Sequence, residues 1–121
     1  MQSYRELIVW QKSIDLVAEV YDIVKSFPKE EIYALSSQVR RAAVSIPSNL
    51  AEGASRSSLK EQIHFIEIAF GSLNELMCQL EISYSLNYIT SEQLERVETQ
   101  VKIVAQLMSG LKKSKEQELA K

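Results

Sequence analysis

With 121 residues, of which 45% are hydrophobic and 25% charged, the chain has the length of one domain and a globular composition, which argues against a disordered protein. Three glycines and two prolines are too few for the many tight turns of a β-sandwich or barrel, so helices are favoured. Sixteen acidic residues against fourteen basic ones leave a formal net charge of −2, which excludes a surface that is basic throughout.

The first predicted helix covers residues 5–26. Its apolar residues form two neighbouring rows, each stepping by three and four along the sequence. One row is Leu7, Trp10, Ile14, Val17, Tyr21 and Val24. The other is Val9, Leu16, Val20, Ile23 and Phe27. A face this broad predicts more than one packing neighbour. Pro28 ends the helix, because the residue before a proline avoids helical geometry.

The second predicted helix covers residues 30–53 and carries two stripes. Its apolar stripe is Ile32, Leu35, Val39, Ala42, Ile46 and Leu50. Its polar stripe is Gln38, Arg41, Ser45, Asn49 and Glu52. Pro47 removes the hydrogen bond to the carbonyl of Ala43, at a cost of about 3 kcal/mol in a helix interior. We expect Ser48, Asn49 or a water molecule to satisfy that carbonyl, and Gly53 to end the helix with a positive φ.

The third and fourth predicted helices cover residues 58–86 and 91–114. The apolar face of the third is Leu59, Ile63, Ile66, Phe70, Leu73, Met77, Leu80 and Tyr84. That of the fourth is Leu94, Val97, Val101, Val104, Met108 and Leu111. Ser58 with Glu61, and Thr90 with Gln93, have the spacing of capping boxes. Gly71 predicts the close approach of another backbone; the alternative is a tolerated glycine on the exposed side of the helix.

Short connections join these helices, which makes consecutive helices antiparallel neighbours. The sequence therefore predicts an all-α fold, an antiparallel up-down-up-down four-helix bundle, as one domain over residues 1–121. No stretch approaches the roughly 20 apolar residues of a membrane span, and the N-terminal apolar run is too short for a signal peptide. The lone Cys78 excludes an intrachain disulfide. We expect a soluble, cytoplasmic protein without a membrane partner.

The polar stripe of the second helix is interpreted as structural. A partly buried arginine needs a carboxylate, because an unpaired buried charge is costly. Glu52 lies about three turns from Arg41 on the same helix, whereas Glu75 on the antiparallel third helix can face it. We therefore predict a contact between Arg41 and Glu75. The predicted polar seam comprises Gln38, Arg41, Ser45, Asn49, Glu52 and Glu75.

A catalytic interpretation of the same stripe lacks partners. It would use Ser45 or Ser48 as the nucleophile and Glu52 as the base, but the only histidine is His64, and no glycine-rich elbow presents a serine. No cluster of His, Cys and carboxylates has the spacing of metal ligands. The sequence predicts no enzyme, no cofactor, no metal site and no small-molecule substrate.

Two groups of basic residues are candidates for phosphate contacts. The C-terminal group is Lys112, Lys113 and Lys115, which we interpret as a solvated helix end favoured by the helix dipole. The central group supplies the candidate nucleic-acid contacts Arg40, Arg56 and Lys60. Arg41 is a weaker candidate because the predicted seam uses it.

Several stretches resemble a known family, namely LIVWQKSIDL, FPKEEIYAL, SQVRRAAVSIPSNLAEGASR and FIEIAFGSLNEL. They are similar, over nearly the whole chain, to the four-helix bundle proteins encoded in intervening sequences of bacterial 23S ribosomal RNA genes. The resemblance implies an all-helical subunit that assembles into a ring, typically a homopentamer, without established enzymatic activity. Ala34 stands where that family often has glycine.

A divergent branch of that fold is the accessory variability determinant of diversity-generating retroelements, whose basic surface is associated with nucleic acid and a reverse transcriptase. The net negative charge of this chain argues against that branch. Two hypotheses follow. The first is a non-enzymatic homo-oligomeric bundle that acts as an adaptor for RNA or for a nucleic-acid-handling protein. The second is a purely structural or protein-binding ring without a nucleic-acid role.

Overall fold

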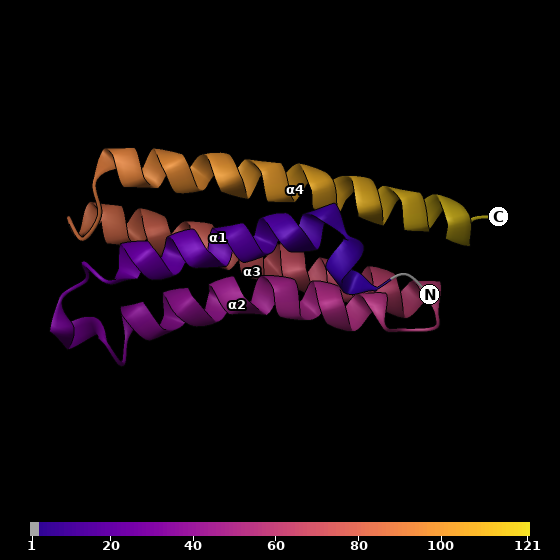
Figure 1. Ribbon diagram of the computed structural model, residues 1–121, viewed down its shortest axis with the longest axis horizontal. Helices are drawn as coiled ribbons and strands as arrows, with labels where there is room; N and C mark the ends of the chain where they lie inside the picture. Colours follow the sequence, from indigo (N-terminus) through magenta and orange to yellow (C-terminus); the bar gives the residue numbers. More distant parts are fainter. Residues whose placement is uncertain (1–2) are drawn as a thin grey trace.

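The computed structural model describes residues 3–121, and its fold consists of four long helices. They are α1 (Ile8–Val24), α2 (Leu35–Ala54), α3 (Leu59–Ser85) and α4 (Ser91–Leu119). Two short 3-10 helices, η1 (Tyr4–Glu6) and η2 (Lys29–Glu31), precede α1 and α2. The helices lie side by side along the longest axis, and the chain reverses direction at each connection (Figure 1). The structure confirms the predicted all-α four-helix class.

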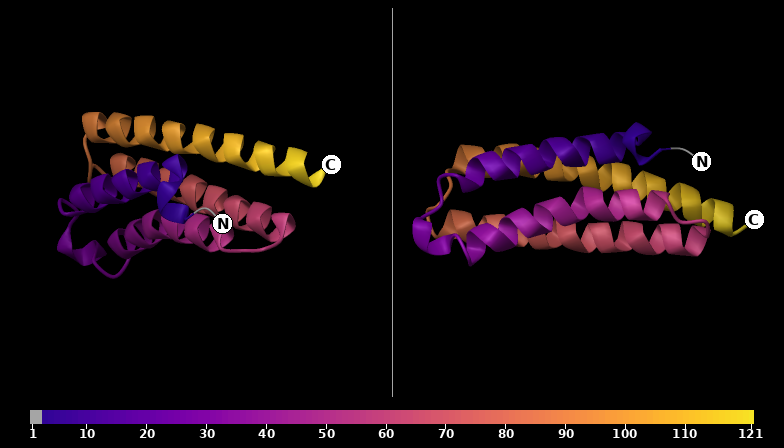
Figure 2. Two further views of the ribbon diagram at one scale, coloured as in Figure 1. Left: turned by 45° about the vertical axis from the view of Figure 1, so that its right-hand side comes forward. Right: turned by 60° about the horizontal axis from the view of Figure 1, so that its bottom comes forward.

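Each long helix packs on two others. Helix α1 contacts α2 and α4, and α3 contacts the same two helices. The turned views show that the four helices surround a common interior and do not lie in one layer (Figure 2). This arrangement gives every helix an inward face and leaves an outward face on each.

The core is built from side chains of all four helices that are almost completely buried. The largest of these are Leu16, Val20, Ile23, Val39, Ile46, Leu73, Leu76, Leu80, Val97, Val104 and Met108. Full burial of one such side chain stabilises the fold by about 1.5–3 kcal/mol. The interior therefore supplies much of the stability of the bundle.

Only one of the two apolar rows of α1 lies fully in this core. Val9, Leu16 and Phe27 belong to the buried row, whereas Ile14 and Tyr21 of the other row remain 40% and 42% exposed. The row through Ile14 and Tyr21 lies on the side of α1 next to α2. The apolar surface of α1 is thus wider than the part of it that the other helices of the bundle cover.

The helix boundaries differ from the prediction by two residues or more at four places. Helix α1 begins at Ile8 instead of residue 5, because residues 4–6 form η1. Helix α1 ends at Val24, and α2 begins at Leu35 instead of residue 30, because residues 29–34 form η2 and a turn. Helix α4 continues to Leu119, five residues beyond the predicted end. The capping box of Thr90 and Gln93 is complete, whereas Ser58 only accepts a hydrogen bond from the backbone of Glu61.

The roles predicted for two glycines were wrong. Gly53 lies inside α2 without a positive φ. Its function is close approach, because a Cβ there would lie 2.9 Å from the Cβ of Phe65 and 3.3 Å from the carbonyl oxygen of Gln62 on α3. Gly71 has no such neighbour within 4 Å. The close contact that we expected at Gly71 is therefore made at Gly53, and Gly71 is a tolerated glycine on the exposed side of α3.

Candidate functional site

The N-terminal half of the polar stripe lines an open hollow between α2 and α3. Gln38 and Arg41 contribute from α2 and Glu75 from α3, and all three side chains are exposed. Glu75 accepts a hydrogen bond from Nε2 of Gln79 at 3.0 Å. Within residues 3–121 no ion pair shorter than 4.0 Å joins Arg41 to Glu75, so the predicted contact is not formed. The reason is solvation: an exposed guanidinium does not need a carboxylate to replace its water.

The middle of the stripe is a hydrogen-bonded seam across the same two helices. The Oγ atoms of Ser45 on α2 and Ser72 on α3 lie 2.8 Å apart. Asn49 extends the seam, since its Nδ2 donates to the carbonyl oxygen of Ser45 at 2.8 Å and to Ser45 Oγ at 2.9 Å. These side chains are half-buried and satisfy one another. This part of the stripe has the geometry of a structural contact.

Pro47 lies in α2, which continues through it to Ala54. Ser48 Oγ donates to the carbonyl oxygen of Val44 at 2.8 Å, and Asn49 donates to that of Ser45. The sequence had suggested that one of these side chains would reach the carbonyl of Ala43, but neither does. The two side chains instead support the carbonyls that directly follow it, which holds the turn around the proline.

Glu52 belongs to a different contact at the end of α2. Its carboxylate accepts a hydrogen bond from Nη2 of Arg56. The Arg56 guanidinium also lies over the ring of Phe65, 4.9 Å from its centroid, an arrangement that favours a cation electrostatically. Arg56 is therefore committed to protein contacts rather than free for a phosphate.

The three candidate nucleic-acid residues do not form one patch. Arg40 lies near the start of α2, where its Nη2 donates to the carbonyl oxygen of Ile32 at 3.5 Å. Arg56 follows the other end of α2, about 24 Å away at 1.5 Å per residue, and Lys60 is exposed in the first turn of α3. Arg40 instead shares a hollow with Arg41, beside Tyr21 and Val44. The structure thus groups the basic residues differently from the sequence-based set.

Two of the C-terminal lysines were wrongly interpreted as solvated. Lys112 Nζ lies 3.5 Å from a carboxylate oxygen of Glu67 on α3. Lys115 Nζ donates to Oε1 of Gln62, also on α3, at 2.7 Å. Lys113 alone of the three points to solvent as expected. These contacts join the last part of α4 to α3.

The sequence analysis did not recognise that residues of α1 and α2 together form one partly exposed apolar face. We define the α1–α2 apolar face by Trp10, Ile14, Val17, Tyr21 and Val44. Two adjoining hollows follow it, and Val44 lines both. Val44 escaped the sequence analysis because it lies outside the apolar stripe of α2, although the broad face predicted for α1 was a signal for it.

The serines and the histidine considered for catalysis are not brought together. Ser45 bonds Ser72 and Asn49, Ser48 bonds a helix carbonyl, and His64 is exposed on α3 with its ring edge-on to Phe65. Among residues 3–121, no three His, Cys, Asp or Glu side chains lie close enough to hold a metal ion. Within the same described range, no helix has the length and apolar character that crossing a bilayer requires.

The comparisons with known proteins agree with this fold. The family model of the 23S rRNA-intervening sequence protein matches residues 5–110. The chain belongs to this family. A solved structure from Bacteroides thetaiotaomicron, described as a protein with unknown function from the S23 ribosomal protein family, is 25% identical with a TM-score of 0.81. The match covers 88% of this chain and 99% of that chain.

The comparison with curated proteins gave no match. Membership in the 23S rRNA-intervening sequence family confirms the resemblance seen in the sequence, and neither match indicates an enzyme family. The matched range ends at residue 110, so the last turns of α4 lie outside it.

Proposed function

We propose that this protein is a non-enzymatic subunit that assembles with further copies of itself through the α1–α2 apolar face. The observation that carries the proposal is the row of α1 through Ile14 and Tyr21, which the bundle covers only in part. Ile14 and Tyr21 of this row and Val44 on α2 are each 40% or more exposed. Contiguous exposed apolar side chains that are rimmed by polar residues mark an interaction surface.

The charged residues beside the α1–α2 apolar face are complementary to those of a second copy of the chain. Exposed Asp15 and Asp22 lie beyond it on α1, and Arg40 and Arg41 border it on α2. A copy that brings its acidic edge against this basic edge buries the apolar strip and pairs the charges at its rim. Such complementarity fixes the register of an interface more than its affinity. The family resemblance implies a ring, typically a homopentamer.

Mass measurement by light scattering tests this assembly. We expect the wild-type protein to have a mass several times the 13.8 kDa of one chain. Val44→Glu places a charge in the strip, and we expect it to shift the mass towards 13.8 kDa. Ile103→Glu is the matched control, since Ile103 on α4 is 41% exposed and Val44 is 40% exposed; this variant should keep the wild-type mass. A wild-type monomer at all concentrations would refute the proposal.

RNA binding is the second candidate function, suggested by the family's description. The supporting observation is that Arg40 and Arg41 line one hollow, and neither has a carboxylate partner within 4.0 Å in the described part of the chain. The candidate set for RNA contacts therefore becomes Arg40, Arg41 and Lys60, with Arg41 in place of Arg56. If both arginines contact phosphates, the slope of log K against log salt concentration for binding to 23S rRNA fragments becomes shallower in the double variant R40A/R41A. The change should correspond to the loss of about two phosphate contacts.

The control for that measurement is R56A, because Arg56 is already paired with Glu52. We expect R56A to keep the wild-type salt dependence. Absence of binding at low salt would remove the RNA role and favour the alternative, a structural or protein-binding ring.

A further inference from the structure

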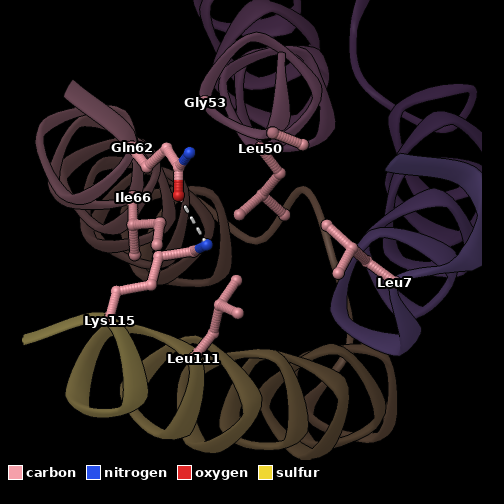
Figure 3. Close-up of a pocket in the computed structure, with 8 residues that line it drawn as sticks. Leu7, Leu50, Gly53, Gln62, Ile66, Leu111 and Lys115 are labelled. Atoms are coloured by element: carbon pink, nitrogen blue, oxygen red, sulfur yellow. Dashed lines mark hydrogen bonds between the residues drawn. The ribbon is translucent and has the colours of Figure 1, made fainter. Parts of the chain in front are cut away.

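A cavity at one end of the bundle places a lysine ammonium among apolar walls. It has a volume of about 120 Å³ and lies between α2, α3, α4 and Leu7, the residue that precedes α1. Figure 3 shows the side chains of Leu7, Leu50 and Leu111 converging on this space, with Lys115 and Gln62 on its opposite side. Ile66, Gly53 and Ala54 complete the lining. The site combines an apolar chamber with one cationic group.

The position of the ammonium is fixed by a short chain of hydrogen bonds. Gln62 Nε2 donates to the carbonyl oxygen of Arg56 at 2.7 Å, which turns Oε1 of Gln62 towards α4. Lys115 Nζ donates to that Oε1 at 2.7 Å. An ammonium has three donors, so two remain after this bond.

The charge of Lys115 is not neutralised by the protein. Its one hydrogen-bond partner is a neutral amide, and within residues 3–121 no carboxylate oxygen lies within 4.0 Å of Nζ. The neighbouring Lys112, by contrast, pairs with Glu67. A half-buried cation beside an apolar chamber is stabilised by an anion that shares the chamber, because charge-assisted hydrogen bonds strengthen away from water.

We propose that this cavity binds a short-chain aliphatic carboxylate. The carboxylate would accept the two free donors of Lys115, and the chain would lie against Leu7, Leu50 and Leu111. The size sets the class of ligand: an apolar cavity of about 150 Å³ holds benzene, so this smaller one suits an alkyl chain of about four carbons with the carboxylate beside Lys115. The proposal does not depend on self-assembly or RNA binding.

Saturation-transfer NMR with pentanoate tests the proposal on the full chain. We expect saturable transfer to the aliphatic protons of pentanoate, and much weaker transfer to pentanamide, which has the same chain without the charge. Lys115→Met keeps the length of the side chain without its charge, and we expect it to weaken pentanoate binding about tenfold or more, as loss of a charge-assisted bond does. Lys113→Met is the matched control, because Lys113 is exposed two residues away.

A second variant guards against a change in folding at Lys115. Ala54 lines the cavity from the end of α2, and Ala54→Leu fills the space with apolar atoms. We expect this variant to keep or raise the unfolding temperature and to lose pentanoate binding. Equal binding by K115M and K113M would overturn the proposal, as would equal transfer to pentanoate and pentanamide or the absence of saturable transfer in the wild-type protein.

Discussion

The Oγ atoms of Ser45 and Ser72 lie 2.8 Å apart, and this hydrogen bond joins α2 to α3 in the half-buried middle of the polar seam. Asn49 donates to the same Ser45 Oγ, so the bond is part of a small network rather than an isolated pair. Between the apolar contacts of α2 and α3, such a network fixes how the two helices align.

We predict that Ser45→Ala and Ser72→Ala each lower the free energy of unfolding by about 1 kcal/mol, since each removes the hydrogen bond between the two hydroxyls. The double variant should lose less than the sum, with a coupling energy of about 1 kcal/mol. Urea unfolding of the four proteins measures this cycle. Ser109→Ala is the control, because Ser109 is exposed on α4; strictly additive losses would show that the hydroxyls do not interact.

The two helical glycines should respond in opposite directions to alanine. Gly71→Ala should raise the free energy of unfolding by about 1 kcal/mol, because its Cβ meets nothing within 4 Å and alanine favours the helix. Gly53→Ala should lower it, because the new Cβ lies 2.9 Å from the Cβ of Phe65, and overpacking costs about 1–3 kcal/mol. Denaturant midpoints at equal slope measure both. Equal stabilisation by the two changes would contradict the close approach at Gly53.

The helices were predictable because their signals are local. Apolar steps of three and four set the helical segments, and Thr90 with Gln93 set the start of α4 correctly. Residues 30–34 were assigned to a helix because Ile32 fits the apolar stripe of α2, but Ile32 is 44% exposed there. Spacing alone also cannot say which of two neighbouring rows faces the core. In α1 that choice depends on where α2 and α4 lie.

The candidate site was less predictable because its contacts join residues far apart in the sequence. The stripe of α2 was visible, but whether Arg41 is solvated or paired depends on how closely α3 approaches at that level. The partner of Lys115 is 53 residues earlier in the chain, and no local pattern distinguishes a lysine that reaches α3 from one that points to solvent. Periodicity gives the face of a helix but not its neighbour.

Tyr88 and Glu31 provide a pH-dependent contact between distant connections. The Tyr88 hydroxyl donates to Oε2 of Glu31 at 2.8 Å, which ties the α3–α4 connection to η2. This hydrogen bond, with burial and the negative charges of Glu31 and Glu30, raises the pKa of Tyr88 above its ordinary value of 10.0. The folded protein therefore holds the phenol proton more tightly than the unfolded chain does.

The sign of the pH dependence follows from that shift. Stability from the contact is fully present below the unfolded pKa of about 10.0 and is lost as pH rises through the higher folded pKa. We predict that Tyr88→Phe unfolds at lower denaturant than the wild type at neutral pH, and that the gap closes above pH 10.0. Tyr33→Phe is the control, since Tyr33 is 96% exposed, and it should change the midpoint at neither pH.

Ultraviolet titration of the phenol groups checks the same contact independently. The difference between the wild-type and Tyr88→Phe titrations should give a midpoint above 10.0 for Tyr88. Glu31→Gln keeps an acceptor oxygen but removes the charge that opposes ionisation, so the pKa of Tyr88 should fall towards 10.0. A midpoint that does not move in Glu31→Gln would assign the raised pKa of Tyr88 to the hydrogen bond and burial instead of to the negative charge of Glu31.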